Sequence, residues 1–495
     1  MTNAVCFYLH VHQPYRLSKF SVFDIGKEKS YFDEKKNLEY LSRIVRKSYL
    51  PATEILLDTV RKTDGKFRMG FSITGVVMEQ LEKHYPEVLE NFHRLAKAGC
   101  EIVAESYYHS LSCMHSRQEF ERQVKMHDRK VRKLFGVRPV SFRNTELMYN
   151  NEIASAVQGM GYSTILAEGH EKILGRLSPC FVYKARGSDE HVLFRHYKLS
   201  DDVGFRFPHH YLPAEQYADW ISVTPGNVAN LFMDFETFGE HHWEESGILK
   251  FLARFPIETL KKQCVFLTPS EASTQFEPLA EVDVPFMTSW ADTERDMSAW
   301  IGNRMQQQAI SELYKIENIV MQSGSPQIME DWRKLQTSDH FYFMCTKYFA
   351  DGDVHKYFNP YETPYEAFMN FMNAVSDIRK RAEAAALGAE QPLGEAKHLL
   401  RDVEFGKSFF ASNGMVYRNV KEFCQGLRKM SDETFRHHAG SGRNDFSNWL
   451  NDVVGDRVLA SQITSASDRK EARQMVKQRI DSLYRAYLRE EKSSL

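Results

Sequence analysis

The chain has 495 residues, a formal net charge of −2, 42% apolar residues, 26% charged residues and 13% aromatic residues. This length is too great for one ordinary hydrophobic core and predicts two or three domains, while the balanced charge lacks the basic excess that indicates a nucleic-acid partner. The composition is that of a soluble globular protein, and the aromatic content is typical of a large core or a carbohydrate-binding groove.

The seven cysteines are scattered along the chain, and none forms a Cys-x-x-Cys pair. An odd number of dispersed cysteines argues against a disulfide framework or a zinc ribbon and for a reducing compartment. The N-terminal segment MTNAVCFYLHVHQP lacks the basic region and the apolar length of a signal peptide, and no stretch approaches the length of a membrane span. We therefore expect a cytoplasmic protein without membrane contact.

Short apolar runs recur through the first 270 residues, and helical patterns lie between many of them, for example at Val76–Ala98 and Arg117–Phe135. Strands that alternate with helices predict a parallel sheet, and about 280 residues of this pattern fit a closed or nearly closed barrel. Gly169–Leu212 looks irregular and is expected to form an excursion. The expected strands are Ala4–Leu9, Phe67–Ile73, Glu101–Ala104, Val140–Phe142, Thr164–Ala167, His191–Phe194, Ala229–Phe235 and Cys264–Leu267.

The character of the chain changes after Trp290. Apolar residues between Met297 and Val320 recur at helical spacing and predict one long amphipathic helix. Asp292 and Glu294 suit its first turn, where backbone N–H groups lack partners. Residues 290–385 are therefore predicted to form a helical subdomain that packs on a catalytic barrel at residues 1–289 and completes the substrate site. Further helices are expected at Ile328–Gln336 and Pro364–Ala386.

Ala384–Ala396 is rich in small residues and contains Gly388, Pro392 and Gly394, so it is the best candidate for a linker. Residues 397–495 show helical patterns and end in a highly charged helix at Ser467–Lys492. No cluster of residues in this segment suggests chemistry. We predict an all-α accessory module of unknown role.

Polar and acidic side chains follow several predicted strands at the points where these strands end. The most informative segment is FMDFETFGEH, residues 232–241, which places Asp234 and Glu236 directly after an apolar run. An α/β barrel builds its active site at the carboxyl ends of its strands, so these side chains are expected to collect on one rim. The other strand-end residues are His10, His12, Gln13, Glu79, Glu105, Tyr107, Tyr108, His109, Arg143 and Glu146.

Each of these residues also has an ordinary structural interpretation. His10 and His12 could be hydrogen-bonded core histidines, Glu79 could be a solvated helix residue, and Glu146 could form an ion pair with Arg143. These interpretations would require several coincidences on one rim, so a functional site is favoured. Two carboxylates from different strands are typical of glycoside hydrolysis, in which one attacks the anomeric carbon or activates water and the other protonates the leaving oxygen.

Two other classes of protein remain open on these residues. A metal-dependent deacetylase or mannosidase-type enzyme could hold zinc with the His-x-His pair, His109 and Asp234, although the remaining carboxylate motifs would then have no role. A metal assay on the purified protein distinguishes that class. A catalytically silent glucan-binding or regulatory protein is the second alternative, and turnover of a maltooligosaccharide would exclude it.

Five segments resemble, in order, the five sequence regions of glycoside hydrolase family 57. The resemblance spans roughly 300 residues, and its longer motifs are specific, whereas a short motif alone is weak evidence. It is closer to the α-amylase-type branch than to the 4-α-glucanotransferase branch. It implies an incomplete, TIM-like (β/α)7 barrel followed by a helical bundle, and a retaining enzyme that acts on α-glucans. The segments are HVHQP (10–14), GVVME (75–79), FRNTEL (142–147), MDFETFGEH (233–241) and WADTERDMSAWIGN (290–303).

The resemblance implies that Glu146 is the nucleophile and Asp234 the general acid/base. Because carboxylates fill both catalytic positions, we expect no metal or other cofactor. The expected substrate is an α-glucan or maltooligosaccharide. Hydrolysis, 4-α-glucanotransfer and branching differ in which acceptor attacks the intermediate, and this choice stays open, as do chain-length preference, linkage preference and oligomeric state. The substrate-binding positions, in which the strand-end residue His109 is included, are His10, His12, Glu79, His109, Glu236, Trp290, Asp296 and Trp300.

Overall fold

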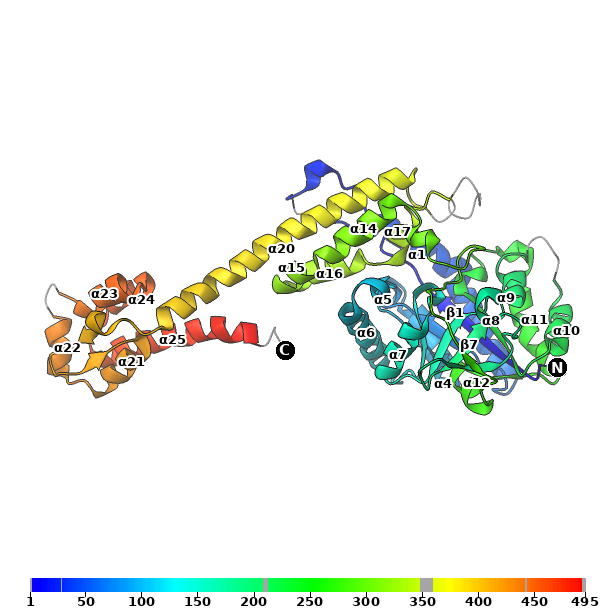
Figure 1. Ribbon diagram of the computed structural model, residues 1–495, viewed down its shortest axis with the longest axis horizontal. Helices are drawn as coiled ribbons and strands as arrows, with labels where there is room; N and C mark the ends of the chain where they lie inside the picture. The colour runs from blue at the N-terminus through cyan, green and yellow to red at the C-terminus, as the bar shows by residue number, and fades with distance from the viewer. Residues whose placement is uncertain (1, 28, 208–211, 348–358, 441–442, 492–495) are drawn as a thin grey trace. The chain divides into compact units, whose positions relative to one another are not determined.

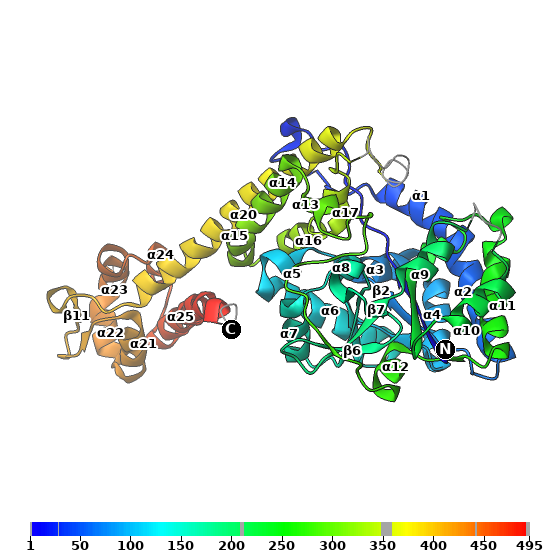
Figure 2. The ribbon, with the colours of Figure 1, turned by 45° about the vertical axis from the view of Figure 1, so that its right-hand side comes forward.

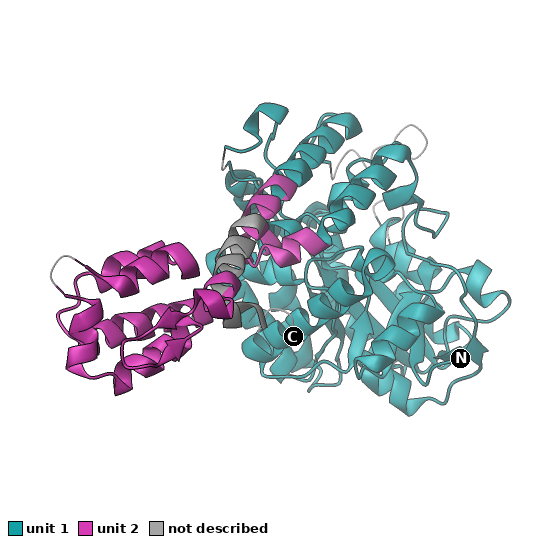
Figure 3. Cartoon of the chain, turned by 60° about the vertical axis from the view of Figure 1, so that its left-hand side comes forward, with its two compact units in different colours: residues 1–317, 330–378 teal, residues 318–329, 379–495 magenta. Residues whose placement is uncertain are grey.

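The computed structural model describes residues 2–27, 29–207, 212–347, 359–440 and 443–491, with backbone alone at 387–396 and 485–491. The chain forms two compact units (Figure 3). Unit 1 contains residues 1–317 and 330–378, and unit 2 contains residues 318–329 and 379–495. The predicted division into three domains at residues 289 and 397 stays a prediction.

Unit 1 is an α/β structure in which helices enclose the strands (Figures 1 and 2). Strand β1 (Ala4–Val11) is buried along its whole length, as expected for a parallel strand that is covered on both faces. The first sheet has the order β3-β2-β1-β8, and β9 also pairs with β1. All of these pairs are parallel. The strands beside β1 are β2 (Gly70–Ile73), β3 (Glu101–Ile102), β8 (Val228–Asp234) and β9 (Val265–Phe266).

The second sheet has the order β10-β6-β7-β5-β4. A parallel bridge between Ala104 and Phe142 connects the chain after β3 to β4 of this sheet. The eight strands expected from the sequence are thus all present. The expected irregular excursion is wrong in part, because Gly169–Leu212 contains β6 in an antiparallel pair with β7. The strands are β4 (Ser141–Arg143), β5 (Thr164–Glu168), β6 (Val182–Ala185), β7 (His191–Arg195) and β10 (Glu281–Val282).

The helices of unit 1 begin and end at residues that explain their bounds. Helix α6 (Arg117–Phe135) has the predicted bounds, because the Ser116 side chain caps its start and Gly136 ends it with a φ of 71°. The helix expected at Val76–Ala98 is two helices, since Pro86 starts a new one. Other helices of the unit are α1 (Glu34–Ile44), α2 (Leu50–Lys62), α3 (Gly75–His84), α4 (Pro86–Lys97), α7 (Asn151–Gly159), α9 (Tyr197–Gly204), α10 (Ala214–Val223), α11 (Ile248–Lys261) and α12 (Pro269–Gln275).

The single long helix expected after Met297 is wrong. The chain forms three helices there, because the Asn303 side chain and Gln306 make a capping box that starts a new helix after Gly302. Asp292 and Glu294 lie outside any helix and pair instead with Lys347, at 3.1 and 3.3 Å. The helices are α13 (Ser298–Ile301), α14 (Arg304–Lys315) and α15 (Glu317–Gln322), followed by α16 (Pro326–Lys334) and α17 (Ser338–Tyr342).

Helix α20 (Pro364–Leu400) runs through the segment expected to be a linker, so this segment is helical, and its role as a linker stays a prediction. Unit 2 is helical as expected, but it is not all-α, because β11 (Phe409–Phe410) and β12 (Val416–Tyr417) form a short antiparallel pair. No helix in the described part of the chain is long and apolar enough to cross a membrane. The remaining helices of unit 2 are α21 (Val420–Lys429), α22 (Asp432–His438), α23 (Asp445–Trp449), α24 (Arg457–Ile463) and α25 (Arg469–Glu491).

Candidate active site

The register of the first sheet brings the end of β1 beside the end of β8. His10 is the pairing partner of both Ser72 on β2 and Asp234 on β8. The strands are parallel, so their carboxyl ends meet at one edge of the sheet, where the His10 Nδ1 atom lies 3.5 Å from Asp234 Oδ1. The rim predicted from the sequence therefore exists at these strands.

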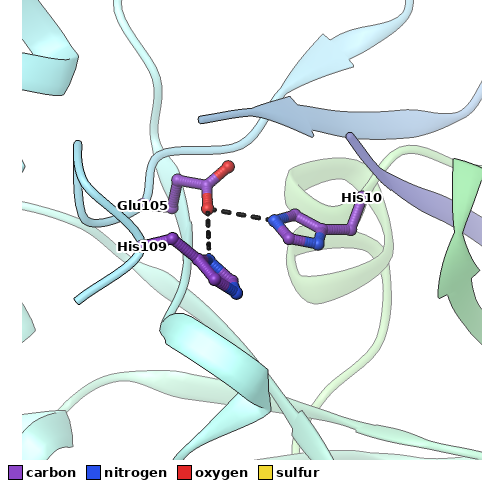
Figure 4. A group of neighbouring side chains, drawn as sticks. All are labelled: His10, Glu105 and His109. Atoms are coloured by element: carbon purple, nitrogen blue, oxygen red, sulfur yellow. Dashed lines mark hydrogen bonds and ion pairs between the residues drawn. The ribbon is translucent and has the colours of Figure 1, made fainter. Parts of the chain in front are cut away.

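Glu105, which follows β3, connects the histidines of this rim (Figure 4). Its Oε2 atom lies 3.1 Å from His10 Nε2, 3.6 Å from His109 Nδ1 and 3.9 Å from Arg143 Nη1. Burial opposes ionisation of this fully buried carboxyl, but the hydrogen bonds and positive charges of its neighbours outweigh burial and hold its pKa well below the usual range. Glu105 was expected on the rim but not among the site residues, because no motif includes it.

Glu146 follows β4 in an unusual backbone conformation. Its φ of 54° and the φ of 51° at Leu147 lie in the left-handed region, which residues other than glycine seldom adopt. His109 has a φ of 51° as well. Such strain is found at functional sites, where surrounding contacts hold it in place.

Three donors surround the Glu146 carboxylate. His109 Nε2 lies 3.2 Å and Ser338 Oγ 3.2 Å from Oε1, while the Trp290 indole Nε1 donates to Oε2 at 2.8 Å. Burial would raise the pKa of Glu146, but His109, through its hydrogen bond and its charge, acts with Arg143 and Trp290 to lower it. Glu146 is therefore an anion at neutral pH.

His109 carries the positive charge between two carboxylates. Burial would lower its pKa, but the hydrogen bonds to Glu105 and Glu146 outweigh burial and raise the pKa to about 9. Its ring stacks on His12, with the ring centres 4.1 Å apart. Burial and the charge of His109 lower the pKa of His12 to about 4. At neutral pH, His109 is thus charged and His12 is neutral.

His12 is held by two side chains that come from different parts of unit 1. Its Nδ1 atom lies 2.9 Å from Thr74 Oγ1, and its Nε2 atom lies 2.9 Å from Asp339 Oδ2 on α17. The sequence reasoning missed Ser338 and Asp339, since they lie far along the chain from every strand-end motif. Only the packing of α17 against the strand ends places these two residues at the site.

Asp234 and Glu236 stand close in sequence but in different surroundings. The Asp234 side chain is 39% exposed, whereas Glu236 is 4% exposed and accepts hydrogen bonds from Tyr49 and, at 3.4 Å, from Gln13. Burial would raise the pKa of Asp234, but the hydrogen bond and the charge of His10 lower it. Burial and the charge of Asp234 raise the pKa of Glu236 to about 8. One carboxylate is therefore accessible and ionised, and the other is enclosed and protonated at neutral pH.

Trp290 is held in place by its own surroundings as well as by Glu146. The guanidinium carbons of Arg143 and Arg195 lie 4.9 and 5.8 Å from the centre of its ring, and Arg295 donates to its backbone carbonyl. Behind it, Arg195 and Arg295 pair with two further acids of the second sheet and α9, namely Glu168 and Asp201. This buried network fixes the indole that contacts Glu146.

The remaining sequence-predicted site residues stand apart from these contacts. Glu79 on α3 accepts hydrogen bonds from the hydroxyls of Tyr107, at 2.7 Å, and Tyr15, at 3.3 Å. Asp296 is exposed and accepts from Ser298. Trp300 is 1% exposed and lies with its ring 6.4 Å from that of Tyr342. The binding roles of Glu79, Asp296 and Trp300 stay predictions.

The arrangement combines a held, ionised carboxylate with a second, accessible carboxylate on another strand. Such a pair can attack a carbon centre and exchange a proton with the group that leaves or enters. Two sets of donor atoms, each lying within 4.8 Å of one another, are also of the type that binds metal ions. They are His10, Glu105 and His109, and His12, His109 and Asp339.

Comparison with known proteins gives concordant results. Residues 6–285 match the family described as glycosyl hydrolase family 57. A protein of Methanocaldococcus jannaschii that is named "Putative alpha-amylase" is 39% identical over 394 residues, which cover 76% of this chain and 84% of that protein.

Two solved structures share the fold. A branching enzyme of the same family from Thermococcus kodakaraensis, in complex with glucose, has a TM-score of 0.58 at 15% identity, with 80% of this chain and 92% of that chain covered. The 4-alpha-glucanotransferase of Thermococcus litoralis has a TM-score of 0.51 at 18% identity, and the match covers 69% of this chain and 56% of that chain. At these identities the likeness concerns the fold.

Proposed function

Because the chain belongs to glycosyl hydrolase family 57, we propose that it cleaves α-glucans by double displacement with retention of configuration. Glu146 is the nucleophile and Asp234 is the general acid/base. The observation that carries this assignment is the continuous set of contacts Asp234–His10–Glu105–His109–Glu146 across the strand ends. The name of the Methanocaldococcus jannaschii relative supports an α-glucan, such as a maltooligosaccharide, as the substrate.

The surroundings of Glu146 suit a nucleophile that must also leave. Its lowered pKa keeps it ionised for attack on the anomeric carbon, which forms a β-glucosyl ester. The hydrogen bonds from His109, Ser338 and Trp290 stabilise the carboxylate again when the ester is broken in the second step. One set of donors therefore serves both steps.

Asp234 is the better candidate for contact with the substrate, and Glu236 acts beside it. Glu236 is enclosed and hydrogen-bonded to Tyr49, so its carboxyl does not face a glycosidic oxygen, whereas Asp234 is accessible. Glu236 holds a proton up to about pH 8. In the proposed reaction, this proton passes from Glu236 to the ionised Asp234 when the glucan binds. Asp234 then delivers it to the departing glucan oxygen and afterwards removes a proton from water or from a sugar hydroxyl.

We also infer that the strands of unit 1 form the incomplete (β/α)7 barrel that the resemblance implies. The parallel strands β1, β2, β3 and β8, the bridge from Ala104 to Phe142, and the parallel strands β4, β5 and β7 support this arrangement. The backbone N–H of His196, which follows β7, donates to the carbonyl of Asn230 on β8 at 2.8 Å. This hydrogen bond connects the end of β7 to β8.

Hydrolysis is the favoured outcome, and transfer to a sugar hydroxyl is the alternative within the same mechanism. Incubation of the purified protein with maltoheptaose separates the two. Shorter maltooligosaccharides alone are the expected products. A ladder of both longer and shorter chains would instead identify a 4-α-glucanotransferase, and products with α-1,6 branches would identify a branching enzyme. The absence of any product at all would contradict the proposed function.

A further inference from the structure

We propose that a cavity at the ends of β5 and β7 binds one glucosyl unit of the α-glucan, at a distance from the bond that is cleaved. This inference rests on the proposed function, because it takes the same substrate to a second place in unit 1. The cavity is lined by residues of two segments, 169–179 and 196–198, and none of them belongs to the five sequence regions of the family. Its volume is about 220 Å³. Pockets for drug-sized ligands have about 300–1,000 Å³, so this cavity suits a smaller group such as one sugar ring.

Both segments lie at the edge of the sheet that carries the candidate active site. Strand β5 is parallel to β4, which ends before Glu146, so the residues from Gly169 onward start at this edge. Strand β7 is parallel to β5 and ends beside it, just before His196. Strand β6 is antiparallel to β7, so its first residue lies at the same edge, and the segment that connects β5 to β6 stays there. The cavity is therefore part of the edge at which Glu146 lies.

Gly169 permits the close approach that shapes the cavity. A Cβ atom at this position would lie 2.3 Å from the carbonyl oxygen of Arg195, at the end of β7, and 3.0 Å from the Cβ of Pro179. A real Cβ atom does not come so close to backbone, so only glycine lets the two segments meet there. The short helix α8 (Glu171–Leu174) then lies beside the first turn of α9, where the Tyr197 hydroxyl donates to Glu171 at 2.9 Å (Figure 1). The cavity is the space that these two segments enclose.

The walls of the cavity combine apolar surface with a polar edge. Leu174, Leu177 and Pro179 supply aliphatic surface, and Tyr197 adds an aromatic ring with a hydroxyl group. Small-molecule sites are typically lined in this way, by apolar and aromatic side chains together with a few polar groups that fix the orientation of the ligand. A pyranose ring has apolar faces and hydroxyl groups at its periphery, so it complements both kinds of surface.

The charges of the wall residues balance and indicate a neutral ligand. The Lys198 Nζ atom lies 3.5 Å from Glu171 Oε1, so the ammonium group and the carboxylate compensate each other. Burial lowers the pKa of His196, so this wall residue is uncharged at neutral pH. An anionic ligand would need an excess of positive charge and a metal ion an excess of carboxylates, and the described wall residues have neither. A glucosyl unit is neutral and meets this condition.

A short series of contacts connects the cavity to the nucleophile. The centre of the Tyr197 ring lies 5.6 Å from the guanidinium carbon of Arg295, and Arg295 donates to the backbone carbonyl of Trp290. The Trp290 indole in turn donates to Glu146 Oε2 at 2.8 Å. Arg295 and Trp290 thus separate the cavity from the catalytic carboxylate. A single glucose bound at Glu146 does not reach the cavity, whereas a maltooligosaccharide that extends past Trp290 does.

The test fills the cavity in the full-length protein with Leu177→Trp, because Leu177 lines the cavity and is 41% exposed. Val140→Trp is the matched control. Val140 is also 41% exposed, but it precedes β4 and so lies at the opposite edge of the sheet.

Leu177→Trp should raise the KM for maltoheptaose by about 10-fold or more with little change in kcat, because a remote subsite binds the substrate and the transition state equally. Its rate on α-glucosyl fluoride, which has one glucose unit, should stay within about twofold of the unchanged protein, since this substrate does not occupy the cavity. Val140→Trp should behave like the unchanged protein with both substrates.

A crystal structure of Glu146→Gln with maltoheptaose keeps the test decisive if Leu177→Trp does not fold. This variant should bind the sugar without cleaving it, and a glucosyl unit should lie in the cavity against the Tyr197 ring.

The subsite and the proposed function can fail separately. If the unchanged protein cleaves neither maltoheptaose nor α-glucosyl fluoride, the proposed function fails, and the dissociation constants of maltoheptaose for the unchanged protein and Leu177→Trp still test the subsite. The subsite is overturned if maltoheptaose does not bind, if Leu177→Trp changes neither the KM nor the dissociation constant, or if it slows the fluoride as much as the heptaose. An equal effect of Val140→Trp, or a cavity without a glucosyl unit in the crystal structure, would overturn it as well.

Discussion

The two units of the chain bury different kinds of side chain. Unit 1 encloses carboxylates and guanidinium groups at its strand ends, among them Glu105 and Arg143 at 0% exposure. The core of unit 2 is apolar, with aliphatic side chains and several aromatic rings, and its buried Asp456 has the local role of capping α24 and pairing with Arg479. Buried charge is destabilising unless partners compensate it closely. Its concentration in unit 1 therefore agrees with the position of the candidate active site there.

The largest expected effect is the loss of the nucleophile. Glu146→Gln retains the shape of the side chain but cannot form a glycosyl ester, so the rate of maltoheptaose cleavage should fall by at least about 10⁴-fold. The matched control is Glu258→Gln, which makes the same change at a buried carboxylate on α11 that pairs with Lys261. This variant should keep most of the activity. Comparable losses of cleavage rate in both variants would show that Glu146 has no special role among the buried carboxylates of unit 1.

The next effect concerns pH and distinguishes Glu236 from Asp234. The pKa of Glu236 is raised to about 8, so the acid pair holds a proton below that pH and activity should fall as the pH rises through it. Glu236→Gln should move this alkaline limb to lower pH and reduce glucan cleavage at pH 7 by about 10- to 100-fold. The rate of Glu236→Gln on an activated glucosyl fluoride should fall much less, because the fluoride leaving group needs no proton. An unchanged pH profile in Glu236→Gln would show that Glu236 does not share the proton.

The same residue affects folding stability with a defined sign. A carboxyl whose pKa is raised in the folded state binds its proton more tightly there, so its contribution to stability is fully present below the unfolded value near 4.5 and is lost as pH rises through about 8. The thermal midpoint of the unchanged protein, relative to that of Glu236→Gln, should therefore decline over this range. Parallel pH dependences of the two midpoints would contradict the shift.

Removal of residues 391–495, which make up most of unit 2, should have a small effect on chemistry. All proposed catalytic and substrate-binding residues precede residue 384, so a soluble, folded chain that ends at residue 390 should cleave maltoheptaose within about threefold of the full-length rate. Circular dichroism must first establish that the shortened chain is folded. A folded but inactive chain would show that the removed residues contribute to the site or stabilise it.

Chelation should have the smallest effect. Carboxylates fill both catalytic positions, so removal of metal ions should leave glucan cleavage unchanged within experimental error. Loss of activity that zinc restores would instead favour the metal-dependent class of enzyme that the His-x-His pair also allows.

Sequence reasoning placed the strand ends correctly because buried parallel strands appear as apolar runs, and His10, Glu146 and Asp234 directly follow or end such runs. It could not place Ser338 and Asp339, whose contacts with Glu146 and His12 bridge 192 and 327 positions of the chain. These contacts arise only when α17 packs on the strand ends.

The helical errors have a different origin. Apolar periodicity continues across Gly302 and Asn303 and so suggested one helix. The capping box of Asn303 and Gln306, which is visible in the sequence, instead starts a new helix at Arg304. At Ala384–Ala396 the small residues, glycines and proline suggested a break, yet the backbone stays helical through α20. Local composition there did not reveal the helical backbone.

The most direct test of the central claim is to identify the carboxylate that becomes glucosylated. Asp234→Asn removes the proton exchange but leaves the nucleophile, so an α-glucosyl fluoride should react in the first step and the covalent intermediate should accumulate. Azide, which needs no base, should speed its turnover. Mass spectrometry of peptides from Asp234→Asn should find the glucosyl adduct on Glu146, and Glu146→Gln should form no adduct. An adduct on another carboxylate, or one that forms in Glu146→Gln, would contradict the assignment of the nucleophile.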